Sequence, residues 1–203
     1  GWAMPKPADI PGLPRARSGP LVVVLDPGHG GLDPGAERDG YSEAGLMLTF
    51  ARELKELLLR DGDFVAILTR DDDLFVPLEA RISIARAAGA HVLISLHADA
   101  LAEGTASGAT IYTLSDGAGD LAAKALAERH ERDDLLAGVD LTEQDDLVAK
   151  VLMDMARTET APRVARLAGA LKTAMQADNI RMHRHPLQTG GFSVLKSPDR
   201  SSI

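Results

Sequence analysis

Two histidines and one glutamate stand where a metal could be bound. His29 lies in the loop DPGHGG that ends the apolar run 21–25, and His97 directly follows the run 90–96. Both runs are typical of buried parallel strands, whose carboxyl ends frame the ligand crevice of an open α/β sheet. Glu43 begins a helical pattern and can reach the same crevice. Two imidazoles and a carboxylate are a donor set of catalytic zinc sites, which leave one position for water.

Simpler interpretations of the same residues exist. The glycine-rich loop could bind phosphate, but GxxxxGK[ST] is absent, and Asp33 occupies the third glycine position of a GxGxxG that begins at Gly28. A single histidine after a strand is commonly a hydrogen-bonded structural residue. Glu43, in a first helical turn, would be stabilised by the helix dipole even without a metal. Two histidines at equivalent strand ends favour the metal site.

The motifs, taken together and in order, resemble the zinc-dependent N-acetylmuramoyl-L-alanine amidases that trim peptidoglycan. The resemblance implies that zinc is bound by His29, Glu43 and His97. It covers nearly all of the chain from residue 20 onward. The matching segments are DPGHGG with Asp33, Gly35 and Ala36 after it, SEAG around Glu43, LTR at 68–70, the segment 78–85, SLHADA at 95–100 and GGFSVLKSPD at 190–199.

Residues around the zinc ligands also receive expected roles. Asp26 and Asp99 are candidates for orienting the imidazoles from outside the ligand set. Arg70 and Arg81 match family positions and are expected to fix loops by ion pairing. The acidic run 71–73 is interpreted as a solvated loop without a metal.

Composition limits the classes of protein and partner. A chain of 203 residues suits one domain with an aliphatic core, since 45% of its residues are hydrophobic and only 3% aromatic. No apolar run is long enough for a membrane span. The net charge of −8 argues against a nucleic-acid partner. Cysteine is absent, so the redox compartment is left open. We expect a monomer.

The first 19 residues are expected to form a disordered linker, because five prolines lie within the first 20 residues. No signal peptide is visible, which indicates a mature or recombinant fragment. The family resemblance implies a periplasmic location.

The elements predicted to position these residues alternate between strands and helices. This order predicts a single α/β domain with a mostly parallel twisted sheet flanked by helices. Ser42 is a plausible N-cap for the first helix. Helices are predicted at 43–60 and 78–88. Strands are predicted at 21–25, 64–68, 90–96, 108–114 (an edge strand) and 192–195. Residues 33–41 are expected to form an exposed loop, and Pro27 is expected to lie outside the first strand.

Residues 115–175 are expected to form an inserted helical segment, with helices at 119–136, 142–158 and 162–175. It resembles the regulatory segment of division-associated amidases, in which a helix covers the zinc until an activator protein of the LytM-like class removes it. The match to the blocking glutamate falls on His130, with Glu131 beside it; a solvated charged helix is the alternative. An apolar stripe in the second helix could be core or could dock the activator: Leu147, Val148, Val151, Leu152 and Met155.

The resemblance implies hydrolysis of the amide between N-acetylmuramic acid and L-alanine, with autoinhibition relieved by the activator during cell separation. It places the general-base glutamate a few residues beyond Ile203, on a strand that begins at Ser202. The chain as written is therefore expected to bind zinc and to cleave weakly or not at all. The alternative is a zinc-containing module that binds peptidoglycan or the activator without turnover. An unrelated zinc peptidase is disfavoured because HExxH is absent.

Overall fold

The computed structural model describes residues 19–98, 107–114, 147–196 and 201–203. Residues 1–18 of the predicted linker and 115–146 of the predicted insert lie outside the described part. So do three residues with predicted roles, Asp99, His130 and Glu131. Of the docking stripe, only the helical backbone is described.

A four-stranded parallel sheet, in the order β4-β1-β5-β8, organises the fold. Its strands are β1 (Leu21–Pro27), β4 (Phe64–Leu68), β5 (Val92–Leu96) and β8 (Ser201–Ser202). The chain passes from β1 to β4 on one side and then to β5 on the other side of β1. In sheets with such a reversal, ligands bind at the carboxyl ends of the two strands beside it, and His29 and His97 follow β1 and β5 at those ends. The predicted α/β class with a mostly parallel sheet is confirmed.

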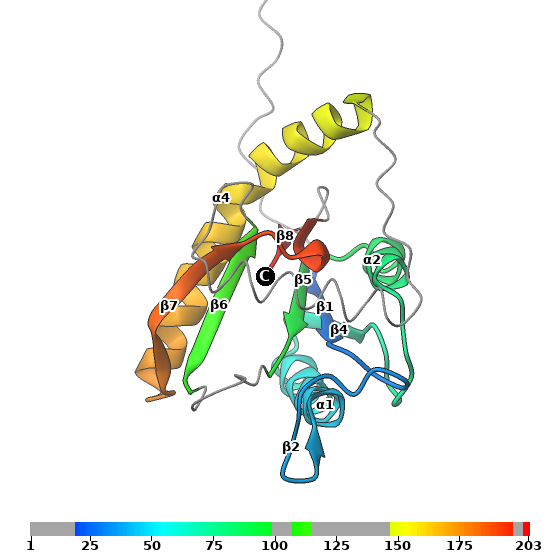
Figure 1. Cartoon of the computed structure of the whole chain (residues 1–203). Coiled ribbons are helices and arrows are strands. Elements are labelled where there is room, and N and C mark those ends of the chain that lie inside the picture. The colour runs from blue at the N-terminus through cyan, green and yellow to red at the C-terminus, as the bar shows by residue number, and fades with distance from the viewer. Residues whose placement is uncertain (1–18, 99–106, 115–146, 197–200) are drawn as a thin grey trace, which may run out of the picture.

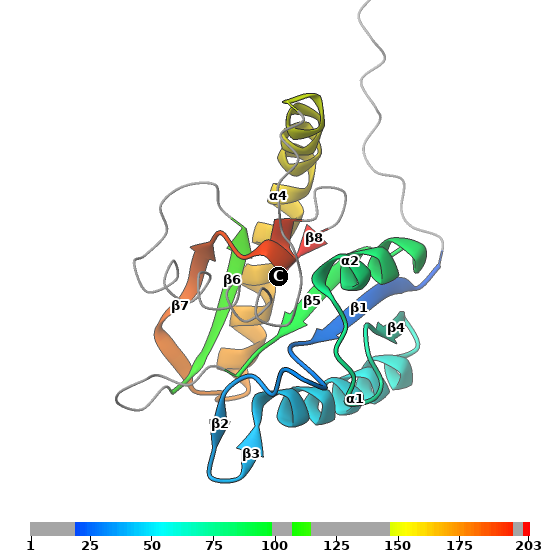
Figure 2. The same cartoon turned by 45° about the vertical axis from the view of Figure 1, so that its right-hand side comes forward.

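Two helices cover opposite faces of the sheet (Figure 2). Val23 and Leu25 of β1 pack with Ala51 of α1 (Glu43–Asp61), whereas Val24 packs with Ala85 of α2 (Leu78–Ala87). The alternation follows from the two-residue period of a strand. Because both faces are buried, β1 reads as a continuous apolar run rather than as alternating apolar and polar residues.

The first helix begins and ends where the sequence predicts. The Ser42 side chain accepts a hydrogen bond from the Gly45 N–H at 3.2 Å, and Gly62 ends the helix with a left-handed φ of 89°. The prediction for the second helix is also confirmed, to within one residue. These helices fix Glu43 and Arg81, which both enter the site described below.

A second, two-stranded parallel sheet consists of β6 (Ala109–Leu114) and β7 (Met182–Gly190). The second half of helix α4 (Leu147–Ala177) lies along it in both views (Figures 1 and 2). Its Ala168 forms a core cluster with Ile111 of β6 and with Ile203, which follows β8. The second half of α4 is therefore part of the domain core. No helix in the described ranges is long and apolar enough to cross a membrane.

Several predicted elements are wrong in detail. Instead of two helices at 142–158 and 162–175, the described residues form one helix that continues through Pro162. Proline costs this helix an intrahelical hydrogen bond, but the core packing of the residues after Pro162 keeps the helix going. The predicted strand 192–195 is a 3-10 turn, η1 (Ser193–Lys196). Phe192 and Leu195 are both buried, and their spacing of three matches such a turn. Strand β7 was not predicted.

Two further differences lie beside His29. Pro27 was predicted to lie outside the first strand because it has no N–H to donate, but it belongs to β1 and pairs with Leu96 of β5. Its nitrogen faces β4 and not β5. The pairing with β4 already ends at Leu25 and Leu68, so the missing N–H costs the sheet no hydrogen bond. The predicted loop 33–41 contains most of a short hairpin, β2 (Glu37–Arg38) and β3 (Tyr41–Ser42), which turns at Asp39 and Gly40.

Candidate metal centre

His29 is held in a sharp turn immediately after β1. Its backbone is left-handed, with a φ of 58°, and its side chain is buried, with 5% exposed. Gly30 and Asp33 close the turn with two backbone hydrogen bonds, of 2.7 and 3.2 Å. The Asp33 carboxylate then returns to His29 and lies 2.7 Å from Nδ1. Nδ1 is thereby occupied, and Nε2 is directed toward Glu43 at 3.3 Å.

Glu43 is the first residue of α1 and is almost completely buried, with 1% exposed. Its backbone N–H donates to the Ala36 carbonyl at 2.8 Å, which fastens the helix start to the loop after His29. Its carboxylate accepts from the Ala36 N–H at 3.1 Å through Oε2 and from the Ala98 N–H at 2.9 Å through Oε1. The carboxylate is therefore fixed from two sides before any metal is considered.

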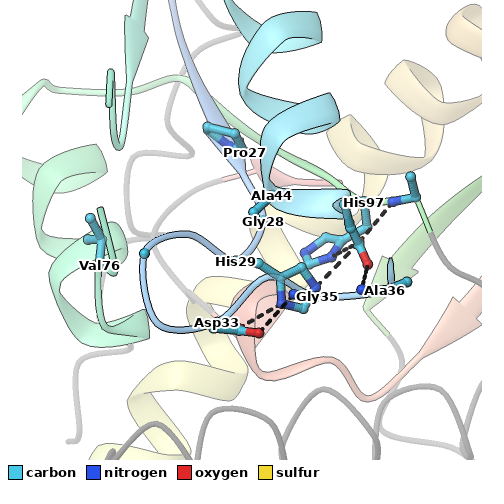
Figure 3. Close-up of polar contacts among 12 residues, drawn as sticks. Pro27, Gly28, His29, Asp33, Gly35, Ala36, Ala44, Val76 and His97 are labelled. Atoms are coloured by element: carbon cyan, nitrogen blue, oxygen red, sulfur yellow. Dashed lines mark hydrogen bonds and ion pairs between the residues drawn. The ribbon is translucent and has the colours of Figure 1, made fainter. Parts of the chain in front are cut away.

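His97 completes the group from the end of β5. Its Nδ1 lies 3.0 Å from Glu43 Oε1, and its ring packs edge-on against that of His29 with the centroids 5.1 Å apart. One ligand atom from each of the three residues lies within 4.8 Å of the others. Figure 3 shows the His29 and His97 imidazoles beside one another, with Asp33 on the far side of the His29 ring. The three residues that the sequence predicts as metal ligands are thus brought together.

Two glycines make room for the imidazoles. A Cβ on Gly28 would lie 2.3 Å from the His97 ring. A Cβ on Gly35 would lie 2.6 Å from the His29 ring, at a backbone φ of 67°. Any side chain at either position would push an imidazole out of place. The glycines of the motif therefore serve the close approach of rings to backbone.

The charges in the group are strongly coupled. Burial lowers the pKa of His29, but hydrogen bonds to Asp33 and Glu43 outweigh burial and raise it to about 9. Burial raises the pKa of Glu43, but its contacts with His29 and His97 outweigh this and hold the pKa well below its ordinary value. Near neutral pH the metal-free site therefore holds an ionised carboxylate and a protonated His29.

Two buried arginines support the loop that carries His29. Arg70 donates to the carbonyls of Pro27 and Gly28 at 3.0 and 2.8 Å, and to that of Ala44 at 2.8 Å. Arg81 donates to the carbonyls of Pro27 and His29, both at 2.8 Å. Both arginines were expected to form ion pairs. Arg81 does so, with its guanidinium 2.8 Å from the Asp26 carboxylate. Arg70 instead donates these hydrogen bonds to backbone carbonyls.

Asp33 is the carboxylate at Nδ1 of His29, and it was not among the residues predicted to orient the imidazoles. Asp26, which was predicted to do so, is buried below the loop and accepts hydrogen bonds from Thr69, Arg81 and Ser95. Burial raises the pKa of Asp26, but Arg81 and Thr69 outweigh burial and lower it. Asp26 therefore acts on the loop through Arg81. The spacing of four residues across the Gly30-Gly31 turn is the signal that could have identified Asp33.

The chain is similar to known proteins over most of its length. A family model described as N-acetylmuramoyl-L-alanine amidase matches residues 23–203. The chain is 38% identical over 194 residues to the N-acetylmuramoyl-L-alanine amidase AmiA of Escherichia coli (strain K12), a match that covers 94% of this chain and 66% of AmiA. It is 38% identical over 192 residues to AmiC of Neisseria meningitidis serogroup B, covering 93% of this chain and 45% of AmiC.

Solved structures support the fold. The apo form of the N-acetylmuramyl-L-alanine amidase Ami1 from Mycobacterium abscessus matches with a TM-score of 0.56 and 17% identity, over 91% of this chain and 82% of that one. At this identity the likeness concerns the fold alone. The chain spans just under two thirds of AmiA and less than half of AmiC.

Proposed function

The chain belongs to the N-acetylmuramoyl-L-alanine amidase family, and from this premise we propose that it hydrolyses the amide between N-acetylmuramic acid and L-alanine in peptidoglycan. The observation that carries the proposal is the convergence of His29, Glu43 and His97 at the carboxyl ends of β1 and β5. Family and geometry support one another, because an amide hydrolase of this kind needs a site that can polarise a carbonyl and activate water.

We propose Zn²⁺ as the bound metal. Two nitrogens and one carboxylate oxygen are a preferred zinc donor set. Their atoms lie within 4.8 Å of one another, so a small inward shift would bring them to the separation of about 3.3–3.6 Å that tetrahedral bonds of about 2.0–2.2 Å set. The Asp33 contact supports this choice, because a metal-binding imidazole commonly donates its other N–H to a carboxylate. Bound zinc would polarise the scissile carbonyl and lower the pKa of a coordinated water toward about 7.

The described residues contribute positioning and charge. Asp33 keeps a proton on Nδ1 of His29 and so leaves Nε2 for the metal. Glu43 supplies the negative charge that partly neutralises a divalent cation, and the Ala36 and Ala98 N–H groups prevent it from rotating. Arg70 and Arg81 hold the intervening backbone rigid, which keeps the ligand atoms near their metal-bound positions before the metal arrives.

Metal-free protein is expected to lose stability as the pH rises. The pKa of His29 is about 9 in the folded chain and about 6.5 in the unfolded chain, so its contribution is complete below pH 6.5 and lost by about pH 9. A shift of this size corresponds to at most about 3–4 kcal/mol. Urea unfolding at intervals from pH 6 to 9 measures the decline. Saturating zinc should abolish it, because the bound imidazole is neutral; an equal decline with zinc would contradict the assignment.

Asp33→Asn is expected to weaken zinc binding by about 10- to 100-fold, the usual cost of removing a carboxylate that orients a ligand. The asparagine keeps the size of the side chain but loses the charge opposite Nδ1. Competition with a fluorescent chelator measures the affinity. Asp39→Asn in the β2–β3 hairpin is the matched control, since the Asp39 side chain is 84% exposed, and it should bind zinc like the parent. Equal affinities in the two variants would refute the role of Asp33.

The regulatory part of the proposal rests on the resemblance of residues 115–175 to the insert of division-associated amidases. We propose a monomeric periplasmic enzyme whose insert covers the metal, with His130 and Glu131 as inhibitory ligands. A LytM-like activator would dock on Leu147, Val148, Val151, Leu152 and Met155. On this proposal His130→Ala raises the basal rate, whereas Arg132→Ala beside it leaves the rate unchanged.

Digestion of purified peptidoglycan tests the activity. The resemblance implies a glutamate beyond Ile203, so the assay uses the protein extended through that position. Mass spectrometry should find stem peptides with a free L-alanine amine, and glycan whose N-acetylmuramic acid carries a free lactyl carboxylate. The products should disappear on chelation and return with zinc. Binding to peptidoglycan without these products would instead favour the non-hydrolytic module.

A further inference from the structure

The acidic run Asp71, Asp72 and Asp73 lies between α1 and the loop that carries His29. On the helix side, Arg52 Nε donates to Asp71 Oδ1 at 3.1 Å, and Lys55 Nζ lies 3.9 Å from Asp71 Oδ2. The run is exposed, as expected, but it is fastened to the helix that begins with Glu43.

The other side of the run contacts the His29 loop. Asp73 Oδ1 accepts a hydrogen bond from the Gly31 N–H at 2.8 Å. The two backbones are packed so closely that a Cβ on Gly31 would lie 2.6 Å from the Phe75 nitrogen, and one on Gly30 would lie 2.3 Å from the Leu74 oxygen. The His29 loop thus packs against residues 73–75 through Gly30 and Gly31, and the Asp73 carboxylate adds a hydrogen bond through its side chain.

Gly31 lies inside the turn that connects His29 to its carboxylate partner. The two hydrogen bonds between Gly30 and Asp33 close this turn around Gly31, and Asp33 then contacts His29 Nδ1. A displacement of Gly31 would therefore move Asp33 and rotate the His29 ring. The bond from Gly31 to an ionised carboxylate is of the stronger, charge-assisted kind.

We propose that Asp73 is a positioning residue for the metal centre: by accepting the Gly31 N–H it fixes the 30–33 turn and, through Asp33, the orientation of His29. The inference rests on the proposed function, since it assumes that His29 binds the metal. Asp73 touches neither the metal ligands nor a substrate and acts only through the turn.

Zinc affinity of the intact chain tests the proposal. Asp73→Ala is expected to weaken zinc binding about tenfold, which is the effect of losing one charge-assisted hydrogen bond. Asp73→Asn keeps an acceptor oxygen and should bind zinc within about twofold of the parent. Asp72→Ala is the control from the same run. It removes an exposed contact to Arg52 at 3.6 Å and should leave the affinity unchanged.

A second readout separates positioning from general destabilisation. The visible spectrum of the cobalt-substituted protein reports ligand geometry, so Asp73→Ala should alter the absorption bands while Asp73→Asn and Asp72→Ala preserve them. Gly31→Ala should weaken zinc binding at least as much as Asp73→Ala, because its Cβ would clash with the Phe75 nitrogen and push the Gly31 N–H away from Asp73. The double variant should be no weaker than Gly31→Ala, because the contact to Asp73 is then already lost.

The outcomes are distinguishable. If the parent chain binds no zinc, the proposed function fails and this inference with it. If the parent binds zinc and Asp73→Ala binds it equally well with an unchanged cobalt spectrum, the positioning role alone is overturned. Additive losses in the double variant would also overturn it.

Discussion

Glu43→Gln is expected to lower zinc affinity by about 10³-fold or more, because removing a ligand charge should exceed the 10- to 100-fold cost of losing an outer partner. The substitution keeps the side chain's shape and an acceptor for the Ala36 or Ala98 N–H. It removes the charge between His29 and His97. In the proposed enzyme this loss should abolish metal-dependent hydrolysis.

The matched control is Glu53→Gln, an exposed position on the same helix. It changes the net charge equally and should bind zinc with parental affinity. Isothermal titration or chelator competition measures both variants, after circular dichroism has confirmed that they are folded. Parental affinity in Glu43→Gln would mean that the metal is bound elsewhere.

Arg81→Met is expected to destabilise the fold by about 3–5 kcal/mol, the usual cost of leaving one partner of a buried ion pair uncompensated. Asp26 is 1% exposed, and it would lose the guanidinium 2.8 Å away that holds its charge. The carbonyls of Pro27 and His29 would lose a donor as well. Chemical unfolding measures the change, with Arg86→Met on the exposed face of α2 as the control.

A double variant shows whether the buried charge causes the loss. Adding Asp26→Asn to Arg81→Met should recover part of the stability, because the neutral amide removes the uncompensated charge. If Arg81→Met costs no more than Arg86→Met, or the second substitution recovers nothing, the buried pair is not what holds the His29 loop in place.

The sequence was informative where one physical rule dominates. Apolar runs with polar ends predicted β1, β4 and β5, and the crevice rule then predicted that His29 and His97 would meet. Ser42 predicted the start of α1 from capping alone, and the end of that helix was predicted to within one residue. These signals are local, and tertiary contacts do not override them.

Predictions failed where distant contacts decide the outcome. Residues 192–195 are mostly apolar, and an apolar segment this short can form either a strand or a 3-10 turn. The side chains that decide between the two, Tyr112 and Leu114 of β6, lie far away in the sequence and pack against Phe192 and Leu195. The hydrogen-bond partners of Asp26 lie 43 to 69 residues away in sequence. The sequence therefore did not predict that Asp26 contacts Arg81, Thr69 and Ser95 and not an imidazole. Asp73 appeared to be part of a solvated run for the same reason, since its partner Gly31 is 42 residues distant.

Anomalous diffraction from crystals of the zinc-loaded chain, recorded on both sides of the zinc absorption edge, tests the central claim most directly. We expect a single strong peak within about 2.0–2.2 Å of His29 Nε2, a Glu43 carboxylate oxygen and His97 Nδ1. A zinc peak held by other residues, or its absence at these three under saturating zinc, would contradict the proposed metal centre and the hydrolytic function built on it.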